Sequence, residues 1–184
     1  MAKVQDVARY ILEKRSDQGH ATTTFALQKF LYYSQAWMLV SRSIPLFNDE
    51  ISAWEHGPVV RSIWNYCRNR RYISPRDIPD GDTDALLPNE EILITRILNL
   101  YADIPDACLG DELEKASHLD KPWQDAYCNN NKVITQNVIH DYYASLQADP
   151  SIAHGARIPM LADISNVTYI SDEDSAFLDN LLAR

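Results

Sequence analysis

The sequence predicts a mainly α-helical fold: one compact multi-helix domain around a central buried helix, with a small β-hairpin or short sheet. Two observations predict it. Residues 25–41 carry apolar side chains on two sides of one helix, which places that helix inside the domain. Residues 50–54 alternate between apolar and polar side chains, as a half-buried strand does. With 184 residues, 46% of them apolar, the chain can enclose a sizeable core.

The N-terminal segment predicts a helix over about residues 3–14. Its apolar residues recur at helical spacing and form one stripe: Val4, Val7, Ala8, Ile11 and Leu12. Gly19 and the threonines at 22–24 interrupt this pattern. Because a threonine oxygen accepts a hydrogen bond from a free N–H at a helix start, one of these threonines is expected to cap the next helix.

The central helix is expected over residues 25–41. One side carries Leu27, Leu31, Ser34 and Met38, and a second side carries Phe30, Tyr33, Trp37 and Val40. Gln28, Tyr32 and Gln35 fall on the remaining strip, at spacings of four and three residues. We expect this strip to be the part of the helix that is left for contacts other than core packing.

Residues 50–54 predict a strand with Ile51 and Ala53 on one face and Trp54 on the other. A lone strand needs partners, so a sheet of two or three strands is expected beside the helices. Gly57 allows a positive φ, and Pro58 suits the first position of a helix. The chain is therefore expected to turn at these two residues straight into a helix over about residues 59–70.

The second half of the domain predicts a loop over residues 74–88 and then further helices. Asn89 is expected to cap the first of them, because two acids follow it in the first turn. The next covers about residues 107–117, and a short one begins within residues 120–123. The last covers about residues 135–146 and is expected to bury Val138, Ile139, Tyr142 and Tyr143.

A domain boundary is expected at Asp149-Pro150, which divides the chain into a domain over residues 1–148 and an acidic C-terminal extension over residues 149–184. Ser171 followed by three acids predicts a short final helix in the extension. That helix has a narrow apolar face made of Phe177, Leu178, Leu181 and Leu182. Since isolated helices this short are marginal in water, it must dock on the domain or on a partner.

Charge and composition restrict the classes of function. A net charge of −9 repels phosphate backbones, which makes nucleic acid an unfavourable partner and favours a basic protein. No apolar run is long enough to span a bilayer, and the N-terminus lacks a signal peptide, so membrane association is not expected. Three widely spaced cysteines indicate reduced thiols and a cytoplasmic protein.

Catalysis and cofactor binding are not expected either. The five glycines form no phosphate-binding loop. Cys108, His118 and Cys128 lack the paired spacing of a zinc site. Nothing in the sequence indicates a thiol activated for nucleophilic attack. The sequence therefore predicts no catalytic residue, no metal site and no cofactor.

Three separated motifs carry a family resemblance. The first is Leu27-Gln28-Lys29-Phe30-Leu31-Tyr32-Tyr33, the second joins Ala53-Trp54 to Gly57-Pro58-Val59-Val60, and the third runs from His118 to Pro122-Trp123. Together they resemble the SocA-like antitoxin family, also called the Panacea domain. Phe30 stands where that family usually has leucine, and Ser117 where threonine is common. Both exchanges are conservative.

The resemblance implies an antitoxin of a bacterial or phage toxin–antitoxin pair that neutralises its toxin by direct binding. One branch of the family is thought to present its toxin to the ClpXP protease, which makes an adaptor role an open alternative. Two other classes stay open: a DNA-binding autorepressor or prophage-encoded regulator, and a hydrolase with a hidden active site. The resemblance does not name the toxin.

The candidate partner-binding residues are Lys29, Tyr32, Gln35 and Trp54 in the domain and Phe177, Leu178 and Leu181 in the extension. Tyrosine and tryptophan supply large contact areas at interface hot spots. The alternative for the central helix is that Gln28 and Tyr33 satisfy buried backbone groups. For the third motif, the alternative is a packed tryptophan, with the His118 imidazole bonded to a backbone carbonyl.

Five arginines fall within sixteen positions of one another: Arg61, Arg68, Arg70, Arg71 and Arg76. They are interpreted as the solvated end of a helix, where cations favour the C-terminal dipole. The alternative is a nucleic-acid patch, against which the acidic chain and the few interleaved aromatics argue.

Overall fold

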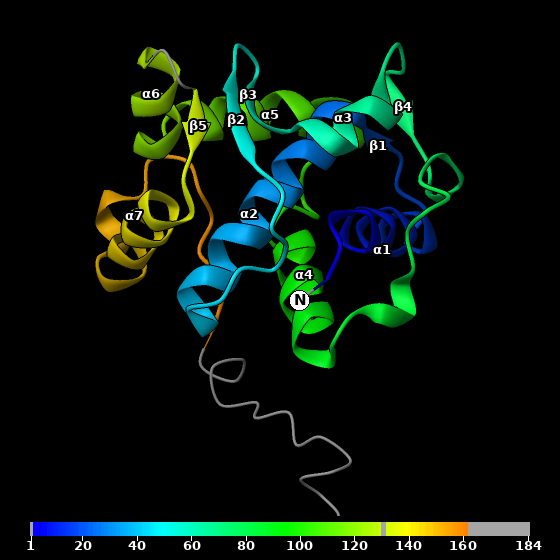
Figure 1. Cartoon of the computed structure of the whole chain (residues 1–184), viewed down its shortest axis with the longest axis horizontal. Helices are drawn as coiled ribbons and strands as arrows, with labels where there is room; N and C mark the ends of the chain where they lie inside the picture. Colours follow the sequence, from blue (N-terminus) through cyan, green and yellow to red (C-terminus); the bar gives the residue numbers. More distant parts are fainter. Residues whose placement is uncertain (1, 130–131, 162–184) are drawn as a thin grey trace, which may run out of the picture.

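The computed structural model describes residues 2–129 and 132–161 and confirms the mainly α-helical fold. Figure 1 shows the helices arranged around α2, which crosses the centre of the molecule. The α-helices of the described residues are α1 (Val4–Asp17), α2 (Thr24–Arg42), α3 (Arg61–Cys67), α4 (Pro88–Leu100), α5 (Asp106–His118), α6 (Lys121–Cys128) and α7 (Gln136–Ala148). None of these helices has both the length and the apolar character needed to cross a membrane.

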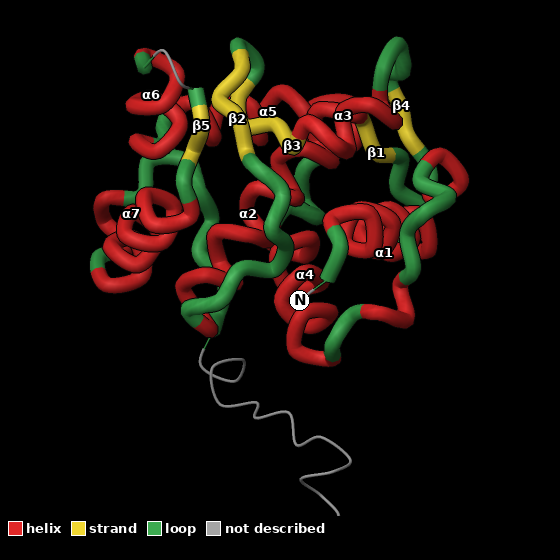
Figure 2. Tube along the Cα trace, in the orientation of Figure 1, coloured by secondary structure: helices red, strands yellow, loops and turns green. Residues whose placement is uncertain are grey.

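The predicted small sheet is present, and a second, smaller one accompanies it (Figure 2). Strands β2 (Ile51–Trp54), β3 (Gly57–Val60) and β5 (Val133–Ile134) form an antiparallel sheet in the order β3-β2-β5. Strands β1 (Thr22–Thr23) and β4 (Tyr72–Ile73) pair separately, with Thr22 opposite Ile73. Short 3₁₀ turns occur at Pro75–Asp77, Thr83–Ala85 and Pro150–Ile152.

Helix α2 is enclosed on every side, which confirms it as the central helix. It contacts α1, α3, α4, α5 and α7 as well as strands β1 and β3. Every residue from Ala26 to Leu39 is buried. The Thr23 hydroxyl accepts a hydrogen bond from the Ala26 N–H at 3.1 Å, which is the threonine cap that the sequence predicts.

Two buried amide side chains on α2 connect the helix to irregular backbone around it. The Gln28 Oε1 accepts from the Val60 N–H at 2.8 Å, which confirms that Gln28 satisfies a buried backbone group. The Gln35 Oε1 accepts from the N–H groups of Leu46 and Phe47, and its Nε2 donates to the Phe47 carbonyl at 3.0 Å. These hydrogen bonds satisfy backbone groups that have no strand or helix partner.

The prediction that Pro58 begins a helix is wrong. Pro58 lies in β3 opposite Ala53, and the following helix starts only at Arg61. Residues 57–60 pair with β2 because the turn at Glu55-His56 brings them back beside it, and local sequence signals do not reveal such pairing. Proline is tolerated here because β3 is an edge strand, where its missing N–H removes no ladder hydrogen bond.

Two other local predictions are also wrong. Asn89 lies inside α4, which starts at Pro88; the Glu90 carboxylate accepts from the Leu87 N–H at 2.9 Å and satisfies the helix start instead. Val138 is 45% exposed, because α7 is covered only on the side that carries Ile139 and Tyr143. The physical reasons are that proline fits the first position of a helix, so α4 starts one residue earlier, and that α7 is covered on one side only.

The described part of the C-terminal extension packs against α4 and α5. Arg157 donates to the Leu100 carbonyl and to the Asp103 carboxylate, and its N–H donates to the Tyr101 hydroxyl at 3.1 Å. Ala156 and Leu161 are buried. The predicted final helix, with Ser171, Phe177, Leu178, Leu181 and Leu182, lies outside the described residues.

The central position of α2 predicts a large effect of Leu31→Ala. Leu31 is fully buried, so its truncation removes apolar contacts and leaves a cavity. We expect the free energy of unfolding to fall by roughly 2–5 kcal/mol in a urea melt. The matched control is Val138→Ala on the exposed side of α7. It should change the free energy of unfolding by less than about 1 kcal/mol. A loss below about 1 kcal/mol for Leu31→Ala would contradict its place in the core.

Candidate functional site

The candidate residues Lys29, Tyr32 and Gln35 are all fully buried. The prediction that Tyr32 and Gln35 belong to an uncovered strip of α2 is wrong, because the β2–β3 hairpin, residues 46–47 and α7 cover that side of the helix. In this conformation these three side chains do not form a surface. Their direct contact with a partner stays a prediction that would require the covering elements to move.

Lys29 lies beneath the turn of the β2–β3 hairpin. A Cβ atom on Gly57 would stand 2.5 Å from the Lys29 Cε and 2.6 Å from the Ser117 Oγ, so any larger residue would displace the lysine and serine side chains. Gly57 also has φ +97°, which glycine adopts without strain. Among the described residues the Lys29 Nζ has no hydrogen-bond partner. Burial lowers the pKa of Lys29 to about 8, against the opposing attraction of Glu114.

Tyr32 belongs to a buried group of tyrosines around Asp120. The Tyr143 hydroxyl donates to the Asp120 carboxylate, and the Tyr32 and Tyr143 rings meet edge to face with centroids 5.9 Å apart. Burial raises the pKa of Asp120 to about 7, while hydrogen bonds from the tyrosines oppose the shift. The group joins the start of α6 to α2 and α7, which is a structural role.

Trp54 is the candidate residue of the domain that reaches the surface. It is half-buried, and its ring meets the Trp64 ring edge to face with centroids 5.6 Å apart. Its carbonyl accepts a hydrogen bond from the Trp123 Nε1 at 3.0 Å. The His118 ring stacks on Trp123 with centroids 4.2 Å apart, so the tryptophan is packed as the alternative proposed, whereas the His118 Nε2 has no hydrogen-bond partner among the described residues.

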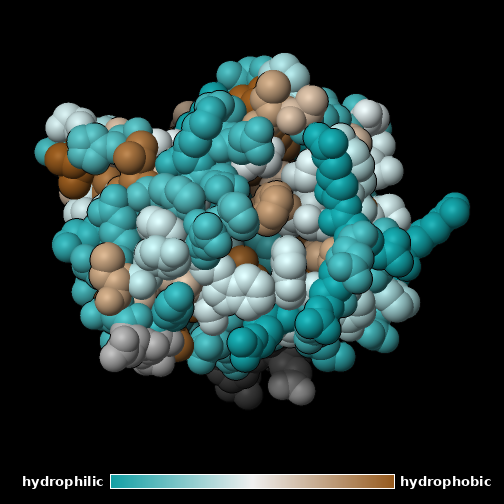
Figure 3. Space-filling view, turned by 90° about the horizontal axis from the view of Figure 1, so that it is seen from above, coloured by the Kyte–Doolittle hydropathy of each residue, from teal (hydrophilic) through white to brown (hydrophobic). Residues whose placement is uncertain are grey.

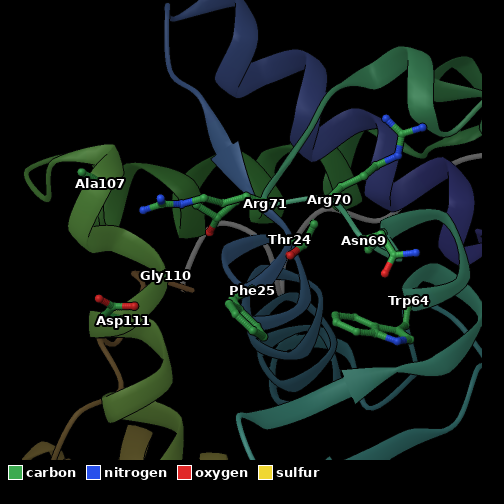
Figure 4. Close-up of a pocket in the computed structure, with 11 residues that line it drawn as sticks. Thr24, Phe25, Trp64, Asn69, Arg70, Arg71, Ala107, Gly110 and Asp111 are labelled. Carbon is green, nitrogen blue, oxygen red and sulfur yellow. The ribbon is translucent and has the colours of Figure 1, made fainter.

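A pocket of about 430 Å³ lies close to Trp54, between the start of α2, the segment from α3 to β4, and α5. Figure 4 shows the Phe25 and Trp64 rings side by side in it, with Asp111 on the α5 side. The Phe25 and Trp64 ring centroids are 6.4 Å apart. The view from the side of the hairpin and α3 shows a mostly hydrophilic surface with small apolar areas (Figure 3). The pocket therefore combines an aromatic interior with a polar edge.

Phe25 connects this pocket to the buried lysine. Its ring centroid is 5.9 Å from the Lys29 Nζ and 5.2 Å from the centroid of His56. His56 in turn contacts the Glu114 carboxylate through Nδ1 at 3.0 Å. The hairpin turn, the first turn of α2 and α5 thus bring apolar and charged groups together at one place on the surface.

Comparison with protein families places this chain in a known family. A family model described as "Antitoxin SocA-like, Panacea domain" matches residues 27–124, more than half of the chain. The chain belongs to this family. The matched region begins in α2 and extends into α6, and it contains both the hairpin and α5. Comparisons with curated proteins and with solved structures gave no match.

The structure explains what the Panacea motifs do in this chain. The first motif supplies the buried interior of α2, including the amide of Gln28. The second forms the hairpin, with Gly57 fitted over Lys29. The third supplies Trp123, which bonds to the hairpin backbone. All three motifs therefore build the scaffold around α2.

Sequence reasoning missed Phe25 and Trp64 as site residues. In the sequence, Phe25 marks only the start of the central helix, and Trp64 is one of the few aromatics among the arginines of residues 61–76. Both are half-buried rather than fully enclosed. The available signal was the combination of tryptophan with closely spaced arginines in residues 61–76.

The titratable groups at or beside this site include the Cys67 thiol and the Lys29 ammonium. Within residues 2–129 and 132–161, no group of three or more His, Cys, Asp or Glu side chains could hold a metal ion. Burial raises the pKa of the Cys67 thiol, on the pocket wall, to about 12, so it is protonated at neutral pH. Lys29 is sealed from solvent.

The buried lysine predicts a stabilising substitution. Lys29→Met keeps a long unbranched side chain and removes a charge that burial disfavours. Because the folded-state pKa of about 8 lies below the ordinary 10.5, the unfolded chain binds more protons between these values, and stability rises with pH across this window. At pH 7 the variant should gain roughly 1–3 kcal/mol in a urea melt.

The control for this prediction is Lys121→Met. The Lys121 side chain is 70% exposed and pairs only with Asp125 on the same helix, so its loss should change stability by less than about 0.5 kcal/mol. The gain from Lys29→Met should also shrink as pH rises from 8 to 10.5. Equal stability of Lys29→Met and the unmodified chain at pH 7 would contradict an energetically unfavourable buried ammonium.

Proposed function

We propose that this protein is an antitoxin that neutralises a cognate toxin by forming a stoichiometric complex with it in the cytoplasm, without catalytic turnover. The observation that carries the proposal is the match of residues 27–124 to the SocA-like Panacea family, which supports an antitoxin role in general. The aromatic and polar pocket beside the hairpin supports binding, because half-buried aromatic rings are typical anchors of protein interfaces.

The proposed contacts divide into direct and supporting ones. Trp54, half-buried beside Trp64, is proposed to touch the toxin. Lys29, Tyr32 and Gln35 are proposed to act from beneath. Gln35 holds residues 46–47 in place, Lys29 lies under the hairpin turn, and Tyr32 packs against Tyr143 of α7. Phe177, Leu178 and Leu181 of the acidic extension are proposed as a second contact that is specific to this protein's own toxin.

Charge supports the proposed role of the extension. The chain carries −9, so a basic toxin would be attracted over a distance and would associate faster. Two mechanisms of neutralisation agree with such a complex: blocking of the toxin's active surface, and delivery of the toxin to the ClpXP protease. They differ in whether the toxin persists in the cell after it is bound.

A DNA-binding autorepressor is the second candidate function. The observation that favours it is the five arginines of residues 61–76, a segment that contains no acidic residue. The overall charge opposes it, because an acidic protein gains little from phosphate contacts. Binding to the DNA of its own promoter, seen as an electrophoretic mobility shift that weakens steeply with salt, would support this candidate.

Co-expression tests the antitoxin proposal. We expect the chain to rescue growth of cells that express the product of the adjacent gene, and the two proteins to co-purify at a 1:1 ratio or another fixed ratio. A double Gln28→Ala, Gln35→Ala variant, which loses the bonds to the hairpin and residues 46–47, should lose both effects through misfolding. Rescue without any physical association of the two proteins would contradict neutralisation by binding.

Truncation after Leu161 tests the extension separately. If the extension is an arm, the melting temperature should remain within about 2 °C, because the described residues 150–161 keep their contacts. A melting temperature several degrees lower, together with loss of activity, would show that the extension belongs to the fold. Binding of the toxin should weaken at least about tenfold if the extension is a recognition arm. As a control for charge, a full-length variant carries Asp172→Asn, Glu173→Gln and Asp174→Asn. A truncated chain that melts normally and still neutralises would refute the arm.

A further inference from the structure

The pocket between α2, α3 and α5 has the size and lining of a site for a short peptide segment. Its volume of about 430 Å³ lies at the lower end of the range of ligand pockets. The half-buried rings of Phe25 and Trp64 lie within it. Trp64 also contacts Trp54, and Phe25 contacts His56, so the rings are held by neighbours on both sides. One apolar side chain can therefore be anchored on preorganised rings.

The charge at the edge of this pocket is opposite to that of the protein. Residues 61–76 contain five arginines and no acid, in a chain with 26 acidic and 17 basic residues. Arg70 already pairs with Asp77 at 3.0 Å. Within the described residues no carboxylate pairs with Arg71, whose guanidinium carbon lies 5.7 Å from the centre of the exposed Tyr72 ring. Arg71 is therefore available to an external anion.

The backbone of Arg71 is fixed although its guanidinium is exposed. The Arg71 carbonyl accepts from the Thr24 N–H at 3.0 Å, and the next residue, Tyr72, pairs with Thr23. The preceding turn depends on Asn69 with φ +61°, a conformation that asparagine tolerates better than most residues. Figure 4 shows Arg71 extended along the α5 side of the pocket, whereas Arg70 points away from it.

We propose that this pocket receives an acidic segment of the partner toxin, with an aromatic or aliphatic side chain on Phe25 and Trp64 and a carboxylate on Arg71. Arginine suits this role because its planar fork binds a carboxylate through two parallel hydrogen bonds. Asp111, on the same α5 side of the pocket as the Arg71 side chain, can accept a hydrogen bond from a backbone N–H of the segment. The inference rests on the proposed antitoxin function and identifies the chemistry of the partner.

A protein segment fits this pocket better than a nucleic acid does. Asp111 lines the pocket and Glu114 follows one turn later on α5, so a phosphate backbone that passes Arg71 would also meet the carboxylates of this neighbouring helix. An acidic peptide can place one carboxylate on Arg71 and direct its uncharged backbone toward α5. A toxin that is basic overall can still carry such a segment.

The experiment uses the full chain and overlapping 15-residue peptides that tile the product of the adjacent gene, with binding followed by fluorescence anisotropy. The same proteins are tested with the intact gene product by calorimetry. We expect one acidic peptide with an aromatic or aliphatic residue to bind. Arg71→Glu should weaken its binding at least tenfold, and Phe25→Ala should weaken it too.

Arg76→Glu is the matched control. It changes the same charge in the same arginine-rich segment, and Arg76 is exposed outside the pocket. It should weaken binding less than threefold. Equal losses for the two variants would show that only long-range charge matters and would overturn the pocket. Because Arg71 is exposed, its variant should keep the melting curve of the unmodified chain.

The remaining outcomes separate the two proposals. If Arg71→Glu binds the intact gene product as tightly as the unmodified chain, the pocket is not the contact, and the antitoxin function stands. If the unmodified chain does not bind the intact product at all, both proposals fail. Arg71-dependent binding of a 20-base-pair promoter duplex, or an Arg71-dependent dimer in size-exclusion chromatography, would assign the pocket to nucleic acid or to a second copy instead.

Discussion

The hydrogen bonds of two buried amides hold the elements of this fold in place around α2. Gln28 satisfies the N–H of Val60, and Gln35 satisfies three backbone groups of Leu46 and Phe47. Leaving such groups unpaired in the interior would cost about 1–3 kcal/mol each, so the hairpin and the 46–47 segment have a strong preference for one position on the helix. The sheet, the lysine beneath its turn and the pocket beside it all follow from this attachment.

The motifs that identify the family describe the interior of the molecule. Lys29 and Asp120 lie in or beside these motifs, and burial moves their pKa values toward neutrality from opposite directions. Buried ionisable groups of this kind reduce stability. The Tyr143 hydroxyl offsets part of this cost at Asp120, whereas the Lys29 ammonium has no hydrogen-bond partner among the described residues. Residues such as Phe25, Trp64 and Arg71 lie outside the motifs, so the surface can vary among proteins that share the scaffold.

Much of the fold could be predicted from the sequence, because helical periodicity is a local property. The central position of α2 followed from its two apolar stripes, and the threonine cap followed from one residue type. The strand at Gly57–Val60 could not be predicted, because its pairing depends on β2 and on Gln28, thirty-two positions from Val60. The pocket could not be predicted for a similar reason: Phe25, Trp64 and Gly110 come together only in the folded chain.

The β3 edge of the three-stranded sheet has no outward N–H group that is free to pair with another strand. Alternate N–H groups of a strand point the same way, and that of Val60 points away from β2, toward Gln28. The nitrogen of Pro58 must point the same way, and it carries no hydrogen. Neither outward position of β3 can therefore donate to another chain. This edge therefore resists strand addition, which protects the protein against edge-to-edge, amyloid-like aggregation, and contacts at this edge would have to use side chains.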